Sequence, residues 1–203
     1  MSDSKRVKRH VPEALPLGPL LGELADDGVA TADLALPLTD KRVAPPVDLR
    51  NRLMASIDGT HRFGAFEDRF AELSDLPGSV ASLLLGRVDD AMHWSKLDAP
   101  GVELFHFDGG PKLRDAITGF VRMKVGAIFP THEHMGEESV LILQGALRDD
   151  DGEVYGPGDE IQMSAHSSHS FSAVGDIPLL FVAIVMKGLT INGQFIPPGD
   201  PRA

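Results

Sequence analysis

The second half of the chain alternates short runs of branched and aromatic residues with turn-forming sequences. Such runs are typical of β-strands. The intervening glycine, proline and aspartate clusters, such as Asp108–Pro111 and Gly156–Asp159, favour tight turns. Turn signals spaced roughly 8–12 residues apart predict a closed or sandwiched antiparallel β domain. The predicted strands are Val102–Phe107, Gly119–Val125, Ser139–Leu143, Glu160–Met163, His169–Val174 and Leu179–Met186.

The first half of the chain carries apolar residues at helical spacing instead. One predicted helix opens at Pro45, because proline is tolerated in the first helical turn, and ends at Gly59. An uneven helical pattern precedes it, and two shorter helices follow it. The predicted helical segments are residues 17–36, 45–59, Phe63–Leu73 and Ser79–Leu85.

These patterns divide the chain into three parts. Residues 1–16 are expected to form a flexible basic tail, residues 17–90 a helical extension, and residues 91–203 a β-barrel domain. A chain of 203 residues can support one core of ordinary size together with such an extension. The predicted fold class is therefore mainly β, a barrel or jelly roll with an N-terminal helical extension.

Composition narrows the function classes. Hydrophobic and charged contents of 42% and 24% are ordinary for a globular protein. A formal net charge of −11 argues against a nucleic-acid-binding surface, which needs clustered lysine and arginine. The chain contains no cysteine, which excludes disulfides and thiolate catalysis and is compatible with a reducing compartment.

Neither a secretion signal nor a membrane span is expected. The basic stretch Lys5–Arg9 resembles the start of a signal peptide, but prolines and a glutamate interrupt the sequence that follows it. The longest apolar run, Leu179–Met186, is too short to cross a bilayer. We therefore expect a soluble, cytoplasmic protein.

The most informative polar residues lie between Gly126 and Gly145. His132, His134 and Glu138 occupy even positions, so on one extended strand all three would point to the same face. Imidazole nitrogens and carboxylate oxygens are ligands of divalent transition metals, and His169 could supply a fourth. Burying such groups without a partner is costly, and a cation offsets that cost. The pattern predicts a metal site; the alternative is a relic whose side chains hydrogen-bond to one another.

This segment resembles a known family. The spacing from Gly126 through His132, His134 and Glu138 to Gly145 matches the first cupin motif at every defined position. The resemblance implies a cupin barrel that holds a divalent metal ion, with zinc favoured and iron, manganese or nickel as alternatives.

The second cupin motif matches less completely. Gly158 and His169 stand where the family has its glycine and its ligand histidine. The chain departs from the family pattern at three positions where proline, glycine and asparagine are usual: Ser164, His166 and Ala173. The ligand histidine is retained, so the resemblance implies His132, His134, Glu138 and His169 as the metal ligands.

Within the cupins, the chain is similar to the ChrR-type anti-sigma factors from about Pro77 to its C-terminus. The resemblance rests on the first cupin motif and on Trp94, Pro100–Leu104, Asp149–Gly152, Tyr155–Asp159 and Gly188–Thr190. In that group an upstream helical domain holds zinc through one histidine and two cysteines. Only residues 45–57 resemble that domain here, and the cysteines are absent, so the usual zinc-dependent half cannot be present.

Other polar residues have simpler interpretations. Glu137 occupies an odd position along the strand and should therefore face away from the site. We expect His166 to lie at the surface or behind the ligands, with a fifth donor or a proton relay as the alternative. His106 is interpreted as an ordinary strand residue, with a pocket residue as the alternative, and His93 as a packing residue. Asp149–Gly152 is interpreted as a solvated hairpin turn. Arg122 and Tyr155 are the candidates for a substrate-recognition arginine and a catalytic tyrosine, with a position outside the site as the alternative.

Two functions remain. The resemblance implies a metal-binding regulatory module with a sigma factor or another protein as its partner. The alternative is a mononuclear metal enzyme, such as a dioxygenase acting on a small organic substrate, because four ligands leave coordination positions open for a small molecule. A homodimer that pairs exposed strand edges is a further expectation.

Overall fold

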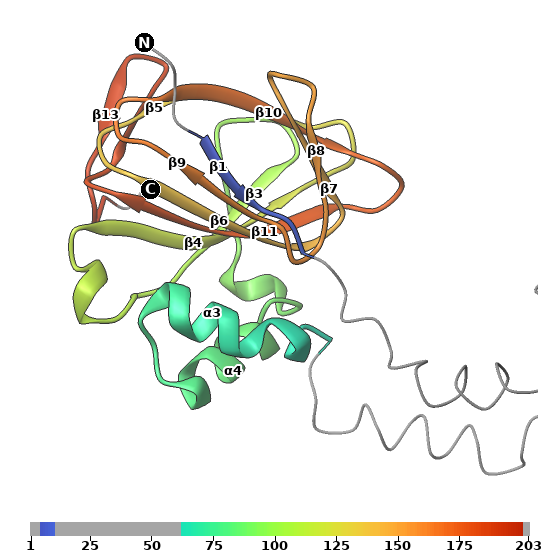
Figure 1. The fold of residues 1–203 in the computed structure, drawn as a ribbon, viewed down its shortest axis with the longest axis vertical. Helices are drawn as coiled ribbons and strands as arrows, with labels where there is room; N and C mark the ends of the chain where they lie inside the picture. The colour runs from blue at the N-terminus through green and yellow to red at the C-terminus, as the bar shows by residue number, and fades with distance from the viewer. Residues whose placement is uncertain (1–4, 11–61, 201–203) are drawn as a thin grey trace, which may run out of the picture. The chain divides into compact units, whose positions relative to one another are not determined.

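Two antiparallel sheets dominate the computed structural model, which describes residues 5–10 and 62–200 (Figure 1). The seven-stranded sheet has the order β1-β9-β6-β11-β4-β3-β2, and the six-stranded sheet has the order β13-β12-β5-β10-β7-β8. The strands are β1 (Lys5–Lys8), β2 (Ser95–Lys96), β3 (Val102–His106), β4 (Ala116–Met123), β5 (Ile128–His134), β6 (Glu138–Gln144), β7 (Ala146–Asp149), β8 (Val154–Tyr155), β9 (Glu160–Met163), β10 (Ser168–Val174), β11 (Leu179–Met186), β12 (Leu189–Ile191) and β13 (Gln194–Ile196).

The core of the barrel lies between the two sheets. Strand β11 lies at the centre of the larger sheet, and its side chains are buried alternately on both faces. Phe181 belongs to the interior cluster, whereas Val182 packs against the helices outside. A strand that is covered on both faces consists of consecutive apolar residues, as the sequence of β11 does.

Two helices, α3 (Glu67–Ser74) and α4 (Gly78–Gly86), cover the outer face of the larger sheet (Figure 1). Phe70 of α3 is fully buried there and packs edge-on or tilted against aromatic residues of the sheet region. Helix α3 ends at Asp75 in the left-handed conformation, and Pro77 precedes α4. Three short 3-10 turns complete the described elements: η2 (Gly64–Phe66), η3 (Ala91–His93) and η4 (Pro111–Leu113).

The predicted mainly β barrel with a helical region before it is confirmed. The predicted bounds of Glu160–Met163 and Leu179–Met186 equal those of β9 and β11, and both short helices after residue 62 are present. The basic tail differs from expectation over Lys5–Lys8, which form strand β1 paired with β9. The sequence does not predict this strand, because Lys5–Lys8 is mostly basic and its strand partners, Glu160–Met163, are distant in the sequence.

The division into residues 1–16, 17–90 and 91–203 stays a prediction. The predicted helices over 17–36 and 45–59 lie outside the described residues. Residues 62–90 share one compact unit with the barrel and pack directly on it. Within the described ranges, no helix is long and apolar enough to span a membrane.

Candidate metal centre

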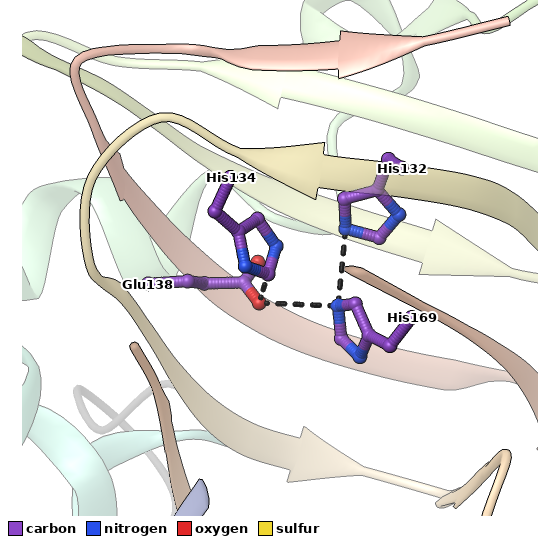
Figure 2. A group of neighbouring side chains, drawn as sticks. All are labelled: His132, His134, Glu138 and His169. Carbon is purple, nitrogen blue, oxygen red and sulfur yellow. Dashed lines mark hydrogen bonds and ion pairs between the residues drawn. The ribbon is translucent and has the colours of Figure 1, made fainter. Parts of the chain in front are cut away.

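The four predicted ligands come from three strands, and the structure brings all of them together (Figure 2). His132 and His134 lie on β5, Glu138 begins β6, and His169 lies on β10. The single extended strand invoked for the first three residues is therefore wrong, because a bend separates β5 from β6. Glu138 points inward for a different reason: it shares the inner face of β6 with Val140 and Ile142.

A β-bulge in β5 turns His132 into the barrel. Phe129 pairs with Phe171 and His132 pairs with His169, so three steps along β5 match two along β10. The extra residue lies at Pro130–Thr131, and proline suits this position because it has no N–H to donate to a ladder. Phe129 and His132 are both buried as a result, although a regular strand would place them on opposite faces.

The donor atoms of the four side chains converge closely. Nε2 of His169 lies 3.1 Å from Nε2 of His132. Oε2 of Glu138 lies 3.2 Å from Nε2 of His134 and 3.4 Å from Nε2 of His169. One donor atom from each of the four residues lies within 4.8 Å of all the others. Figure 2 shows the three imidazoles and the carboxylate directed at a common point.

Hydrogen bonds on the outer nitrogens fix the tautomers of two imidazoles. Nδ1 of His132 lies 2.9 Å from the carbonyl oxygen of Pro130, an acceptor, so Nδ1 carries the proton. The hydroxyl of Ser167 donates to the carbonyl of Ser164 at 2.6 Å, so it accepts from Nδ1 of His134 at 3.1 Å. Both imidazoles therefore direct a lone pair from Nε2 into the cluster.

These donors fit a metal ion. Two Nε2 lone pairs and a carboxylate oxygen are all acceptors, and their mutual approach favours a cation among them. Donors bound at about 2.0–2.2 Å to one ion lie roughly 3.0–3.5 Å apart at tetrahedral or octahedral angles. The separations of 3.1, 3.2 and 3.4 Å match that spacing.

The pKa values favour the ligand forms of these groups. Burial lowers the pKa of His132 to about 4, against the opposing attraction of Glu138. Burial alone would raise the pKa of Glu138, but contact with His169 and the charge of the other imidazoles lower it to about 2. At neutral pH His132 is therefore neutral and Glu138 is ionised, as metal coordination requires.

The other candidate residues lie outside the cluster. Glu137 is exposed, as its parity predicted. His166 is exposed too, and its positive φ of 61° explains why glycine is usual at this position of the motif. Only its backbone serves the site, through an N–H that donates to the carbonyl of His134 at 2.8 Å. Arg122 pairs with Glu103, and Tyr155 donates to Asp149.

Two supporting residues escaped the sequence analysis. Pro130 creates the bulge and accepts from His132, and Ser167 orients His134. Serine is common in loops, so Ser167 gave no distinctive signal. Pro130 could have been noticed, because a proline two residues before a ligand on a predicted strand indicates a bulge or an edge.

An apolar cavity borders the cluster. It has a volume of about 70 Å³ and lies within the barrel, with His132 and Glu138 on its wall. His106 lines this cavity as well, which is the alternative given above to an ordinary strand residue. The arrangement gives a small molecule room beside the cluster.

Known structures of cupin type resemble this chain. A Ralstonia eutropha protein of unknown function with a cupin-like fold is 15% identical; the match covers 48% of this chain and 64% of that one, with a TM-score of 0.41. A chain from the Rhodobacter sphaeroides complex of SigE with the anti-sigma ChrR is 22% identical over 83% and 76% of the two chains, with a TM-score of 0.47. An acetylacetone dioxygenase from Acinetobacter johnsonii is 14% identical over 56% and 83%, with a TM-score of 0.47. No curated protein matches the sequence.

The fold and its buried cluster of three histidines and one glutamate define a cupin-like protein. More specifically, residues 86–185 match the family model of the ChrR cupin-like domain, and this part of the chain belongs to that family. The match begins within α4 and ends within β11, so it includes all four residues of the cluster.

Proposed function

We propose that the protein is a metal-binding regulatory module of the ChrR cupin type, with His132, His134, Glu138 and His169 as ligands. The observation that carries this proposal is the convergence of imidazole lone pairs on an ionised carboxylate. Zinc is the favoured ion, with iron, manganese and nickel as alternatives, because a site of this type takes several of them. When bound, the ion would supply a Lewis acid with open coordination positions.

Elemental analysis of untagged protein tests the metal site. We expect about one equivalent of metal per chain, lost in His132→Ala and in Glu138→Ala. His166→Asn is the matched control, because this exposed histidine has positive φ, which asparagine tolerates. Protein that holds no metal after purification, and takes up none on reconstitution, would contradict the proposal.

The regulatory role is the second part of the proposal. We infer a protein partner, such as a sigma factor, that binds the cupin domain (91–203) together with the helical extension (17–90) in the cytoplasm. The family match supports a partner-binding role, whereas the missing cysteines mean that binding cannot depend on a zinc–thiolate site. Affinity capture from the host with and without oxidant tests this role, and a sigma factor absent from both samples would count against it.

A metal-dependent dioxygenase acting on a small organic substrate is the second candidate function. The apolar cavity beside His132 and Glu138 favours it, because a purely structural metal needs no such space. Oxygen consumption by the iron-loaded protein, measured across small organic acids, thiols and diketones, tests this function. The absence of turnover in iron-loaded protein would leave the regulatory role.

A further inference from the structure

Two small residues lie on the wall of the interior cavity. Gly119 of β4 and Ala183 of β11 are directly opposite each other in the antiparallel ladder, and both line the cavity. Their flanking pairs on the same face are large: Val121 opposite Phe181, and Ile117 opposite Val185. Ala183 remains only half-buried although β11 lies at the centre of its sheet, so its side chain faces open space inside the barrel.

The wall of the cavity is apolar except at a few positions. Among the described residues that line the cavity, only His106, His132 and Glu138 are polar, and the others are apolar or glycine. No arginine, lysine, serine, threonine, asparagine or glutamine of the described chain faces this space. A sugar, a dicarboxylate or a phosphorylated compound would therefore lose its water without regaining hydrogen bonds, whereas an alkyl group would gain from burial.

The cavity and an outer cleft share two wall residues. His106 and Ile117 line both the cavity and an outer cleft of about 540 Å³, where Asp108, Arg114 and Thr118 also lie. Partial burial of its side chain lowers the pKa of His106. A molecule that moved from the cleft to the cavity would meet the imidazole of His106 and the aliphatic side chain of Ile117.

We propose that this cavity, called the chamber from here on, binds a small aliphatic molecule. The molecule has one electron-donating head, a thiol or an oxygen group, that coordinates the metal ion. The molecule enters between His106 and Ile117, and its apolar body lies against Gly119 and Ala183. The proposal rests on the metal site proposed above and adds the class of ligand that occupies it.

Cobalt-loaded full-length protein provides the test, because a thiolate bound to Co²⁺ produces a near-ultraviolet charge-transfer band. We expect 1-butanethiol to bind at least tenfold more tightly than 3-mercapto-1,2-propanediol, which has the same head and a polar body. In the series from ethanethiol to pentanethiol, the dissociation constant should fall about threefold to fourfold for each methylene until the chamber is full. Equal binding of the two thiols, or a flat series, would overturn the proposal.

A variant whose larger side chain fills the chamber provides an independent test of thiol binding. Ala183→Leu should keep the cobalt spectrum but abolish the butanethiol response, whereas the control Ala91→Leu, at an exposed position, should keep both. If Ala183→Leu does not fold, the thiol series on the unaltered chain decides.

Xenon binding separates the two proposals, because dry apolar cavities bind xenon without any metal. We expect a ¹²⁹Xe chemical-shift change with metal-free protein that is lost in Ala183→Leu. Cobalt uptake without thiol discrimination or a xenon response would overturn the chamber and keep the metal site. A xenon response without cobalt uptake would overturn both the metal site and the metal-anchored ligand.

Discussion

The hydroxyl of Ser167 lies 3.1 Å from Nδ1 of His134 and is itself fully buried. Since its own proton goes to the carbonyl of Ser164, this serine acts only as an acceptor toward the imidazole. The backbone of the same residue also holds β5, because its carbonyl accepts from the N–H of His134 at 3.0 Å. Ser167 thus fixes both the position and the tautomer of one ligand without belonging to the donor cluster.

Ser167→Ala should weaken metal binding while leaving all four ligands in place. Loss of a group that orients a ligand histidine typically reduces metal affinity about 10–100-fold. Competition with a chromophoric chelator measures the affinity, and metal content at saturation should stay near one equivalent. Ser168→Ala is the matched control, because Ser168 is the next residue in the chain and is exposed. Equal affinities for the two variants would show that Ser167 does not orient the ligand.

Gly136 controls the spacing between His134 and Glu138. A Cβ at this position would lie 2.5 Å from the carbonyl oxygen of Met186, which is closer than any real contact. The bend cannot move away freely, because the N–H of Met186 donates to Glu137 at 2.9 Å and that of Met135 donates to Gly188 at 3.0 Å.

Gly136→Ala should therefore displace the bend and separate the two ligands. We expect a lower melting temperature and at least a tenfold loss of metal affinity. Gly126→Ala is the control: its φ of +80° makes alanine strained, at about 1 kcal/mol, but no atom lies within 4 Å of the added carbon. The control should lose stability and keep its metal affinity. Unchanged affinity in Gly136→Ala would mean that the bend does not set the spacing.

Sequence patterns predicted the helices and strands in which buried residues recur at regular spacing along one segment. Strand β11 was evident because both faces are covered and every residue is apolar, and α3 was evident from the spacing of Phe66, Phe70 and Leu73. The chemistry of the side chains and the cupin motif together indicate all four cluster residues from the sequence. Their role as ligands stays a prediction until a metal is measured.

The features that escaped prediction depend on contacts between distant segments. The bulge at Pro130 exists only through its register against β10, so parity counted along one strand could not reveal it. Glu138 reached the site for a reason other than the one inferred, since it begins a new strand. Strand β1 has little apolar character, and its partners lie far away in the sequence.

Acid should destabilise the metal-free protein in a defined pH window. The pKa of His132 is about 4 in the folded state and 6.5 ordinarily, so below pH 6.5 the unfolded chain binds a proton that the folded chain does not. Stability is therefore complete above pH 6.5 and declines as the pH falls toward 4, by roughly 3 kcal/mol in total. The lowered pKa of Glu138 acts in the same direction below pH 4.5.

Urea unfolding of metal-free protein from pH 7.5 to pH 5 measures this effect. The free energy of unfolding should decline with falling pH, and less steeply in His132→Asn, which removes the buried imidazole. His166→Asn removes an exposed imidazole and should leave the slope unchanged. Parallel curves for the unaltered chain and His132→Asn would show that His132 does not cause the dependence.

Lys5 attaches strand β1 to the opposite sheet by an ion pair with the buried carboxylate of Asp149, to which Tyr155 also donates at 3.0 Å. Lys5→Ala leaves that carboxylate without its cation, so we expect a loss of about 1–2 kcal/mol. Arg6→Ala is the control, because Arg6 is exposed and forms no ion pair with the described residues. Hydrogen exchange at Glu160–Met163 should become faster in Lys5→Ala alone, because β1 pairs with that strand. Equal exchange in the two variants would mean that backbone pairing, rather than the ion pair, holds β1 on the barrel.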